Sequence, residues 1–412
     1  MITFATPIYA FMAHWVAKQT IQTLNFFDNM VITVVCEILG VLNNGTSIAA
    51  MNLITYMKSK GHTVRVVCPD EDKRGMEGYY ILPKAKMGAI FDYMFKANKL
   101  VFPSFDEKIM REAMTGADLV HVMLPLFIAA KTAKLAHFMN IPLTAGFHAQ
   151  AENFSCQIGM LSFDFVNNRV YKWYDRNLFR WCDAIHYPTK FIRDIFEKSI
   201  RRNTPGYVIS NGVNKEFKPM DVPKPDKYKD KFCILFTGRI STEKSHKVLI
   251  RAVQKSKYND RIQLFFAGVG PKSEQIQSYA KSRLKNELSM DFYSRADLLK
   301  LINMCDLYCH PAEVEIEAIS CLEAISCGKV PVIANSPRCA TKAFAMDERS
   351  LFKVNDSTDL ARKIDHFIEH PEEIAELREK YLARCNAFDF DSCMQRMEQM
   401  MIETSRRCKE NR

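Results

Sequence analysis

Apolar runs alternate with amphipathic stretches along the first part of the chain. The runs at 31–36 and 62–68 flank a stretch, 46–59, with helical spacing that closes at Gly61. Further apolar runs follow at 118–123 and 141–146. Strands that are apolar throughout are typical of a parallel sheet, because helices cover both of its faces. The first part of the chain therefore predicts an α/β domain.

The same alternation restarts after a segment rich in Pro, Lys and Asp at 219–230, which is typical of a linker. The expected strands of this second part are 232–237, 263–267, 307–310 and 330–334. The expected helices between them are 244–255, 272–285 and 317–327. The chain is thus predicted to form two Rossmann-like domains, 30–218 and 219–390, followed by a terminal helical segment at 391–412. Ligands of such folds bind at the carboxyl ends of the strands, so we expect the site in the cleft between the domains.

Residues 1–29 precede the first expected strand, and two interpretations of them stay open. Met30 is a possible start codon, which would make this extension an artefact of the chosen gene start. Alternatively, Phe4, Tyr9, Phe11 and Trp15 belong to an amphipathic arm that contacts a membrane. No basic segment precedes the apolar residues, which argues against a secretory signal. No apolar run is long enough to predict a transmembrane helix.

Composition is that of an ordinary globular protein, except that the net charge is strongly positive. The 412 residues are 48% hydrophobic and 25% charged, which excludes collagen-like and mainly disordered classes. The 13 cysteines are odd in number and none has CxxC spacing, so we expect free thiols in a reducing compartment. The net charge of +10 indicates anionic partners: phosphates, a membrane surface or nucleic acid.

The turn after the strand 232–237 carries two cations. It reads Gly238-Arg239-Ile-Ser241-Thr-Glu243-Lys244. An arginine fork and a lysine point charge at the mouth of a parallel sheet suit a diphosphate. Taken alone, the same residues are also compatible with an ordinary solvated turn.

Two further motifs in the second domain have the spacing of a nucleotide site. Glu315 and Glu323 bracket the start and the middle of the helix 317–327, whose N-terminal N–H groups suit a phosphate. Carboxylates placed there can bind sugar and ribose hydroxyls, although acidic residues also simply favour a helix N-terminus. The Gly268-Val-Gly270-Pro271 turn allows a ligand to approach the backbone closely, but it lacks the third glycine of a dinucleotide fingerprint.

In this order the motifs resemble those of the family-4 retaining glycosyltransferases of GT-B fold. The resemblance covers about residues 30–400. It implies two Rossmann-like domains facing a central cleft, with a C-terminal helix crossing back to the first domain. It also implies a nucleotide-sugar, UDP-glucose or a related UDP-sugar, as the substrate, with no metal and no further cofactor required. The family often has glycines after the first glutamate, whereas this chain has Ile316-Glu317-Ala318.

The resemblance implies a role for each matching residue. Arg239 and Lys244 hold the diphosphate and stabilise the leaving group, Glu315 contacts the transferred sugar, and Glu323 the ribose. His148, after the strand 141–146, contacts the sugar and aligns the acceptor. The catalytic set is then His148, Arg239, Lys244 and Glu315, and the remaining nucleotide-sugar contacts are Gly45, Gly238, Gly268, Gly270, Ile319 and Glu323.

Two segments of the first domain combine basic and aromatic residues. In 84–111 six basic side chains face three acidic ones, and in 163–202 nine face five. Such segments fit docking on anionic lipid, although amphipathic helices that pack on the sheet give the same pattern. We expect a lipid acceptor such as diacylglycerol, as in the bacterial diacylglycerol glucosyltransferase branch, and a peripheral cytoplasmic location on the inner membrane face.

Two alternatives to that function stay open. In the first, the acceptor is a polysaccharide or another soluble glycan in envelope synthesis. In the second, the chain is a non-catalytic nucleotide-binding module. Nucleic acid is not expected as a partner, because neither an aromatic platform nor a recognition helix is evident.

Overall fold

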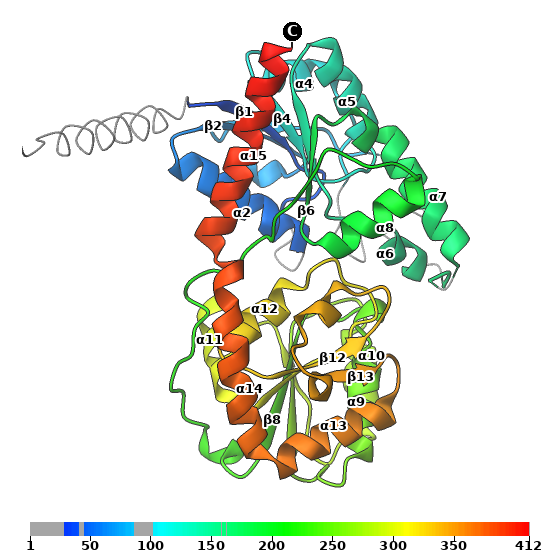
Figure 1. Ribbon diagram of the computed structural model, residues 1–412, viewed down its shortest axis with the longest axis vertical. Coiled ribbons are helices and arrows are strands. Elements are labelled where there is room, and N and C mark those ends of the chain that lie inside the picture. Colours follow the sequence, from blue (N-terminus) through cyan, green and yellow to red (C-terminus); the bar gives the residue numbers. More distant parts are fainter. Residues whose placement is uncertain (1–28, 41–44, 86–101, 158, 162, 412) are drawn as a thin grey trace, which may run out of the picture.

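The computed structural model describes residues 29–40, 45–85, 102–157, 159–161 and 163–411. The N-terminal residues 1–28 and most of the basic-aromatic segment 84–111 lie outside this part, so the expectations for them stay untested. Two α/β domains follow one another along the chain (Figure 1). The predicted fold class is confirmed.

The first domain is built on a seven-stranded sheet of order β3-β2-β1-β4-β5-β6-β7, and all of its paired strands are parallel. Its strands are β1 (Val31–Val35), β2 (Thr63–Cys68), β3 (Tyr79–Ile81), β4 (Leu119–Val122), β5 (Leu143–Gly146), β6 (Ala184–Tyr187) and β7 (Gly206–Val208). Its helices are α2 (Gly45–Ser59), α4 (Glu107–Met114), α5 (Ala129–Phe138), α6 (Ala151–Gln157), α7 (Asp164–Asn177) and α8 (Lys190–Ile200). The order changes direction between β1 and β4, which makes their carboxyl ends the ligand edge.

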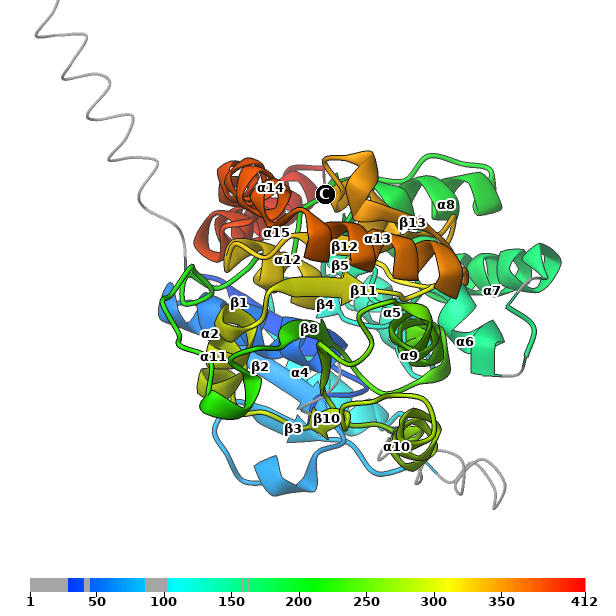
Figure 2. The same ribbon diagram turned by 90° about the horizontal axis from the view of Figure 1, so that it is seen from below.

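The second domain has a six-stranded parallel sheet of order β10-β9-β8-β11-β12-β13. Its strands are β8 (Phe232–Thr237), β9 (Ile262–Ala267), β10 (Ser289–Asp291), β11 (Leu307–His310), β12 (Pro331–Asn335) and β13 (Leu351–Lys353). Its helices are α9 (His246–Lys255), α10 (Ser273–Lys281), α11 (Arg295–Met304), α12 (Ile319–Ser326), α13 (Ser357–Glu369) and α14 (Pro371–Arg384), with the short helix η4 (Thr242–Lys244) before α9. Figure 2 shows α9, α10 and α13 on one side of this sheet and α11, α12 and α14 on the other.

The last helix, α15 (Phe390–Glu410), returns to the first domain, as predicted. Its buried face is rich in methionine and packs with α2 and the sheet. Glu398 accepts a hydrogen bond from Tyr56 and lies 3.0 Å from Nε2 of the buried His62. Lys409 pairs with Asp118 at 2.6 Å. The chain therefore crosses between the domains twice, once after β7 and once before α15.

The two crossings pair with one another. Val213 N–H donates to Phe388 C=O at 2.7 Å, and Phe390 N–H donates to Val213 C=O at 3.1 Å. Gly212 (φ +77°) fits between them only because it lacks a side chain, since a Cβ there would lie 2.7 Å from Cα of Phe390. The paired crossings, 210–213 and 388–390, are the backbone connections between the two domains, and they are called the hinge below.

All 13 cysteines are free thiols, and most are buried. This agrees with the sequence-based expectation. Among the described helices, none is both long enough and apolar enough to cross a bilayer.

Candidate active site

The turns after β8 and β11 form the centre of the site. These two strands are neighbours at the point where the order of the second sheet changes direction. Gly238 to Lys244 follow β8, and Pro311 to Ala318 follow β11. Side chains far apart in the sequence therefore meet at the carboxyl edge, where the switch-point rule places ligands.

Lys244 and Glu315 form a largely buried ion pair at this edge. The Lys244 ammonium donates to the Glu315 carboxylate, and the two side chains are 18% and 12% exposed. Nε2 of the buried His310 lies 3.4 Å from the same carboxylate oxygen. Burial by itself would raise the pKa of Glu315, but the charge of Lys244 and the contact with His310 outweigh it and lower the pKa to about 2. Glu315 is thus an anion throughout the neutral range, and its pairing stabilises the fold above its ordinary pKa and is lost as the pH falls toward 2.

The two glycine turns pack against one another beside this pair. A Cβ on Gly268 would lie 2.2 Å from the C=O oxygen of Gly238, and one on Gly270 would lie 2.4 Å from that of Ile240. Gly238 N–H also donates to Ala267 C=O at 3.0 Å. Gly268 and Gly270 therefore have a structural role: without side chains, they let the turn that carries Arg239 pack against them. A role for them in binding a ligand stays a prediction.

Gly268→Ala is expected to lower the free energy of unfolding by about 3 kcal/mol, because the new Cβ meets backbone and the φ of +149° is unfavourable for alanine. Gly45→Ala is the matched control. A Cβ at Gly45 meets nothing within 4 Å, so we expect a change of about 0.5 kcal/mol at most. Calorimetric unfolding of both variants is the measurement. Equal unfolding midpoints would contradict this account of the paired turns.

Helix α12 begins directly beside the ion pair. Ser320 donates to the Thr237 C=O at 3.1 Å, which fixes the first turn of α12 against the end of β8. Ala318, the residue before the helix, adopts the left-handed conformation (φ 59°) that costs a non-glycine residue energy. Ile319 lies in that first turn, and Glu323 lies one turn further on. Burial raises the pKa of Glu323 to about 7, against the opposing charge of Arg295.

The first domain presents His148 just after β5. A Cβ on Gly146 would lie 2.5 Å from Nε2 of His148, so that glycine makes room for the imidazole. The ring stands 5.5 Å from His186. Burial, with the neighbouring His186 and His121, lowers the pKa of His148 well below its usual value. His148 is therefore a neutral side chain that can donate or accept a hydrogen bond.

The loop of His148 reaches the second domain. Arg338 C=O accepts a hydrogen bond from Gln150 Nε2 at 3.0 Å and another from Glu315 N–H at 3.3 Å. Helix α6, which follows Gln150, contacts η4. The loop of His148 therefore lies against the segment that carries Glu315, and Lys244 and Glu315 are in direct contact. Gly45 lies at the start of α2, in the other domain from that pair.

Sequence reasoning missed the contribution of His310. It closes a strand at the switch point, a position that the carboxyl-edge rule marks as ligand-facing. Sequence reasoning also missed Glu317, whose partners lie more than 100 residues away. No local pattern signals such a contact.

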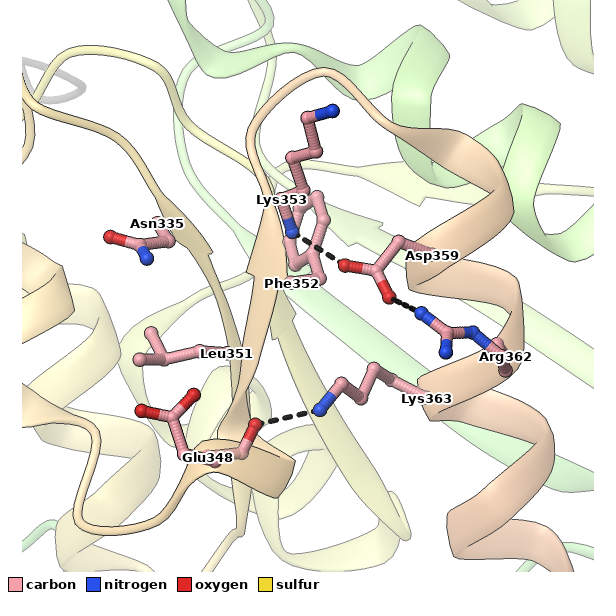
Figure 3. Close-up of a pocket in the computed structure, with 8 residues that line it drawn as sticks. All are labelled: Asn335, Glu348, Leu351, Phe352, Lys353, Asp359, Arg362 and Lys363. Carbon is pink, nitrogen blue, oxygen red and sulfur yellow. Dashed lines mark hydrogen bonds and ion pairs between the residues drawn. The ribbon is translucent and has the colours of Figure 1, made fainter.

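A cavity of about 310 Å³ opens elsewhere, between β13 and α13 (Figure 3). Two of its cations are engaged within the protein: Lys363 donates to the Glu348 C=O, and Arg362 pairs with Asp359 (Figure 3). None of the expected site residues lines it. Among the described residues, no group of three or more His, Cys, Asp or Glu side chains is placed to hold a metal ion.

Comparisons with known proteins point to one enzyme class. The family described as Glycosyltransferase Family 4 matches residues 43–217, and the family described as Glycosyl transferases group 1 matches residues 217–383. A search of curated proteins found no match.

Solved structures of similar fold span almost the whole chain. A glycosyltransferase from Rickettsia africae is 16% identical, with 92% of this chain and 99% of that one covered and a TM-score of 0.69. The Anabaena protein Alr3699/HepE, in complex with UDP and glucose, is 15% identical over 90% of this chain and 99% of its own, with a TM-score of 0.68.

A third solved structure covers a smaller part of the chain. The catalytic domain of cholesterol-alpha-glucosyltransferase from Helicobacter pylori is 45% identical over 37% of this chain and 96% of its own, with a TM-score of 0.36.

Proposed function

The chain belongs to the family-4 glycosyltransferases of GT-B fold. On that premise we propose that it transfers a hexose, most simply glucose, from a UDP-sugar to a lipid acceptor. The observation that carries the proposal is the buried Lys244–Glu315 pair at the carboxyl edge of β8 and β11. A cation and a carboxylate side by side offer one group for a diphosphate and one for the hydroxyls of the attached sugar.

The residues around the pair supply the remaining contacts. Arg239 and Lys244 neutralise the diphosphate, and the N–H groups at the start of α12, at Ile319, add to that stabilisation. Glu315 accepts hydrogen bonds from the sugar and Glu323 from the ribose. Gly45, at the N-terminus of α2, faces the phosphates from the first domain. The complexes of the Anabaena protein with UDP and UDP-glucose make UDP-glucose the first substrate to test.

We propose transfer with retention of configuration and without a metal. The bond between the anomeric carbon and the diphosphate oxygen breaks, and the electron pair leaves with the diphosphate. The acceptor hydroxyl attacks the same face, and its proton passes to the departing phosphate oxygen. The fixed cations stabilise the charge that develops on the leaving group. His148, neutral because it is buried, orients the sugar and the acceptor hydroxyl by hydrogen bonding.

The lipid acceptor is supported by an exposed apolar surface on α6, α7 and the turn between them. Its large side chains range from 37% to 68% exposed: Phe154, Met160, Phe163, Phe165 and Trp173. Arg169 stacks over Phe165 at 5.1 Å. The opposite face of α7 packs Tyr171 and Tyr174 around Phe147, as the packing interpretation predicts for part of this segment. Docking on lipid stays a proposal that rests on the exposed side chains. Basic and aromatic side chains exposed together suit the interface of an anionic bilayer.

A panel of substrates tests the proposal. Purified protein receives UDP-glucose, UDP-galactose or GDP-mannose, with either diacylglycerol or a sterol in anionic vesicles or soluble glycans as acceptors. Mass spectrometry and linkage analysis identify the product. We expect a glycolipid with UDP-glucose as the substrate. A product formed only on soluble glycans supports the alternative acceptor, and no product with any pair contradicts the proposed function. Vesicle flotation that is indifferent to anionic lipid and to salt would contradict the membrane role.

The affinity for UDP is expected to rise with pH through about 7. The pKa of Glu323 is about 7, so the carboxylate becomes ionised in that range and accepts stronger hydrogen bonds from the ribose hydroxyls. Binding of UDP is measured by titration calorimetry between pH 5.5 and 8.5. Glu323→Gln is expected to bind more weakly and to lose this step. A step that persists in the variant would assign it to another group.

A further inference from the structure

Glu317 is a buried carboxylate that the proposed chemistry does not use. It lies two residues after Glu315 and is 4% exposed. Its three hydrogen-bond donors all come from the first crossing between the domains. Ser210 Oγ donates to Oε1, Asn211 N–H donates to the same oxygen at 3.2 Å, and Asn211 Nδ2 donates to Oε2 at 2.6 Å.

A second contact holds the same segment from the first domain. Thr189, at the start of α8, donates from its hydroxyl to the Ile316 C=O at 2.8 Å. Ile316 and Glu317, the two residues after Glu315, are therefore held by side chains of the first domain and of the hinge. Ser210 and Asn211 directly precede Gly212, which packs against the second crossing. The contact of Glu317 thus reaches the hinge itself.

We propose that Glu317 is a positioning residue: it locks the segment that carries Glu315 to the hinge, so that domain closure and placement of the sugar-binding carboxylate occur together. Three donors converge on one buried carboxylate, and losing some of these hydrogen bonds would cost free energy because buried polar groups would be left unpaired. When the domains move apart at the hinge, Glu317 loses these donors, and the turn between β11 and α12 is released. The inference rests on the proposed function for its effect on turnover, but not for the contact itself.

Substitutions at Glu317 and Asn211, one alone and then both together, test the contact between the Glu315 segment and the hinge. Glu317→Gln removes the negative charge and one of the two acceptor oxygens, so the charge-assisted hydrogen bonds from Ser210 and Asn211 become neutral ones and the Asn211 side chain has to turn its amide over to accept from the new nitrogen. We expect kcat to fall at least tenfold, whereas the Kd for UDP changes less than threefold. Combining Glu317→Gln with Asn211→Asp reverses the direction of one hydrogen bond, because the new amide donates to the new carboxylate, and keeps the same number of charges. This double variant is expected to recover kcat to within about threefold of the wild type.

A matched control separates positioning from stability. Ser256, at the C-terminal end of α9, donates from its hydroxyl to Asp365 of α13, and Asp365→Asn disturbs that contact away from the Glu315 segment. We expect this variant to lower the melting temperature as Glu317→Gln does, with kcat unchanged. Normal kcat in Glu317→Gln would overturn the proposal. So would a folded double variant that recovers nothing.

Hydrogen–deuterium exchange keeps the test independent of the reaction. If the wild type transfers no sugar, the proposed function fails, yet the lock is still measured. Glu317→Gln is expected to speed amide exchange in both 209–213 and 315–320, and the double variant to restore protection in both. Exchange that changes in neither segment, or only in 315–320, would overturn the coupling between them.

Discussion

Lys244→Ala is expected to reduce kcat by about 10³-fold, the effect of removing one fixed charge from a developing anion. The loss has two physical parts. In the proposed mechanism the departing diphosphate loses a fixed cation. Glu315 also remains without its cation, which raises its pKa and disturbs the contacts proposed for it with the sugar. The rate of UDP release at saturating UDP-sugar is the measurement.

The chain offers a closely matched control for Lys244. Lys224 pairs with Asp306 at 2.6 Å, at the opposite, amino ends of β8 and β11, and the exposed fraction of its side chain, 23%, is close to the 18% of Lys244. Lys224→Ala is expected to destabilise the second domain without changing kcat. If both lysine variants lose activity equally, the effect is one of folding, and the assignment of the site to the carboxyl edge is wrong.

Glu315→Gln is expected to reduce kcat by 10²-fold to 10³-fold while the protein remains folded. The amide keeps the shape of the side chain but lacks the charge that pairs with Lys244 and accepts from sugar hydroxyls. Because the pKa of Glu315 is about 2, the wild type carries this charge at every practical pH, so we expect no acid limb of activity from Glu315.

Two further variants show whether the loss comes from chemistry or from the fold. Asp306→Asn is the counterpart at the amino ends of the strands and should keep kcat. The double variant Lys244→Met with Glu315→Gln removes both buried charges, so it is expected to recover stability relative to Lys244→Ala yet stay inactive. Recovery of activity in the double variant would contradict a direct role for the pair.

The sequence predicted the architecture because the architecture follows from local pattern. Apolar runs such as 232–237 mark buried strands, and the residues that follow them must lie at the carboxyl edge. Lys244 and Glu315 were therefore expected at one place although 71 positions separate them. The order of the motifs then added the family and its chemistry.

The remaining features depend on how the domains meet, which periodicity does not encode. The contact of Glu317 with Asn211 joins two loops across the hinge, and Ala318 takes a left-handed conformation where a glycine was the ordinary choice. The apolar side chains of α7 also could not be assigned from the sequence to the buried or the exposed face. Helical spacing could not tell which of them pack on Phe147, as Tyr171 does, and which remain exposed, as Phe165 does.

The most direct test of the central claim is release of UDP from UDP-glucose in the presence of lipid vesicles and a metal chelator. The account predicts release that depends on the lipid acceptor, persists in the chelator, and falls by about 10³-fold in Lys244→Ala but not in Lys224→Ala. Release that is absent in the wild type, or that is the same in Lys244→Ala, would contradict it.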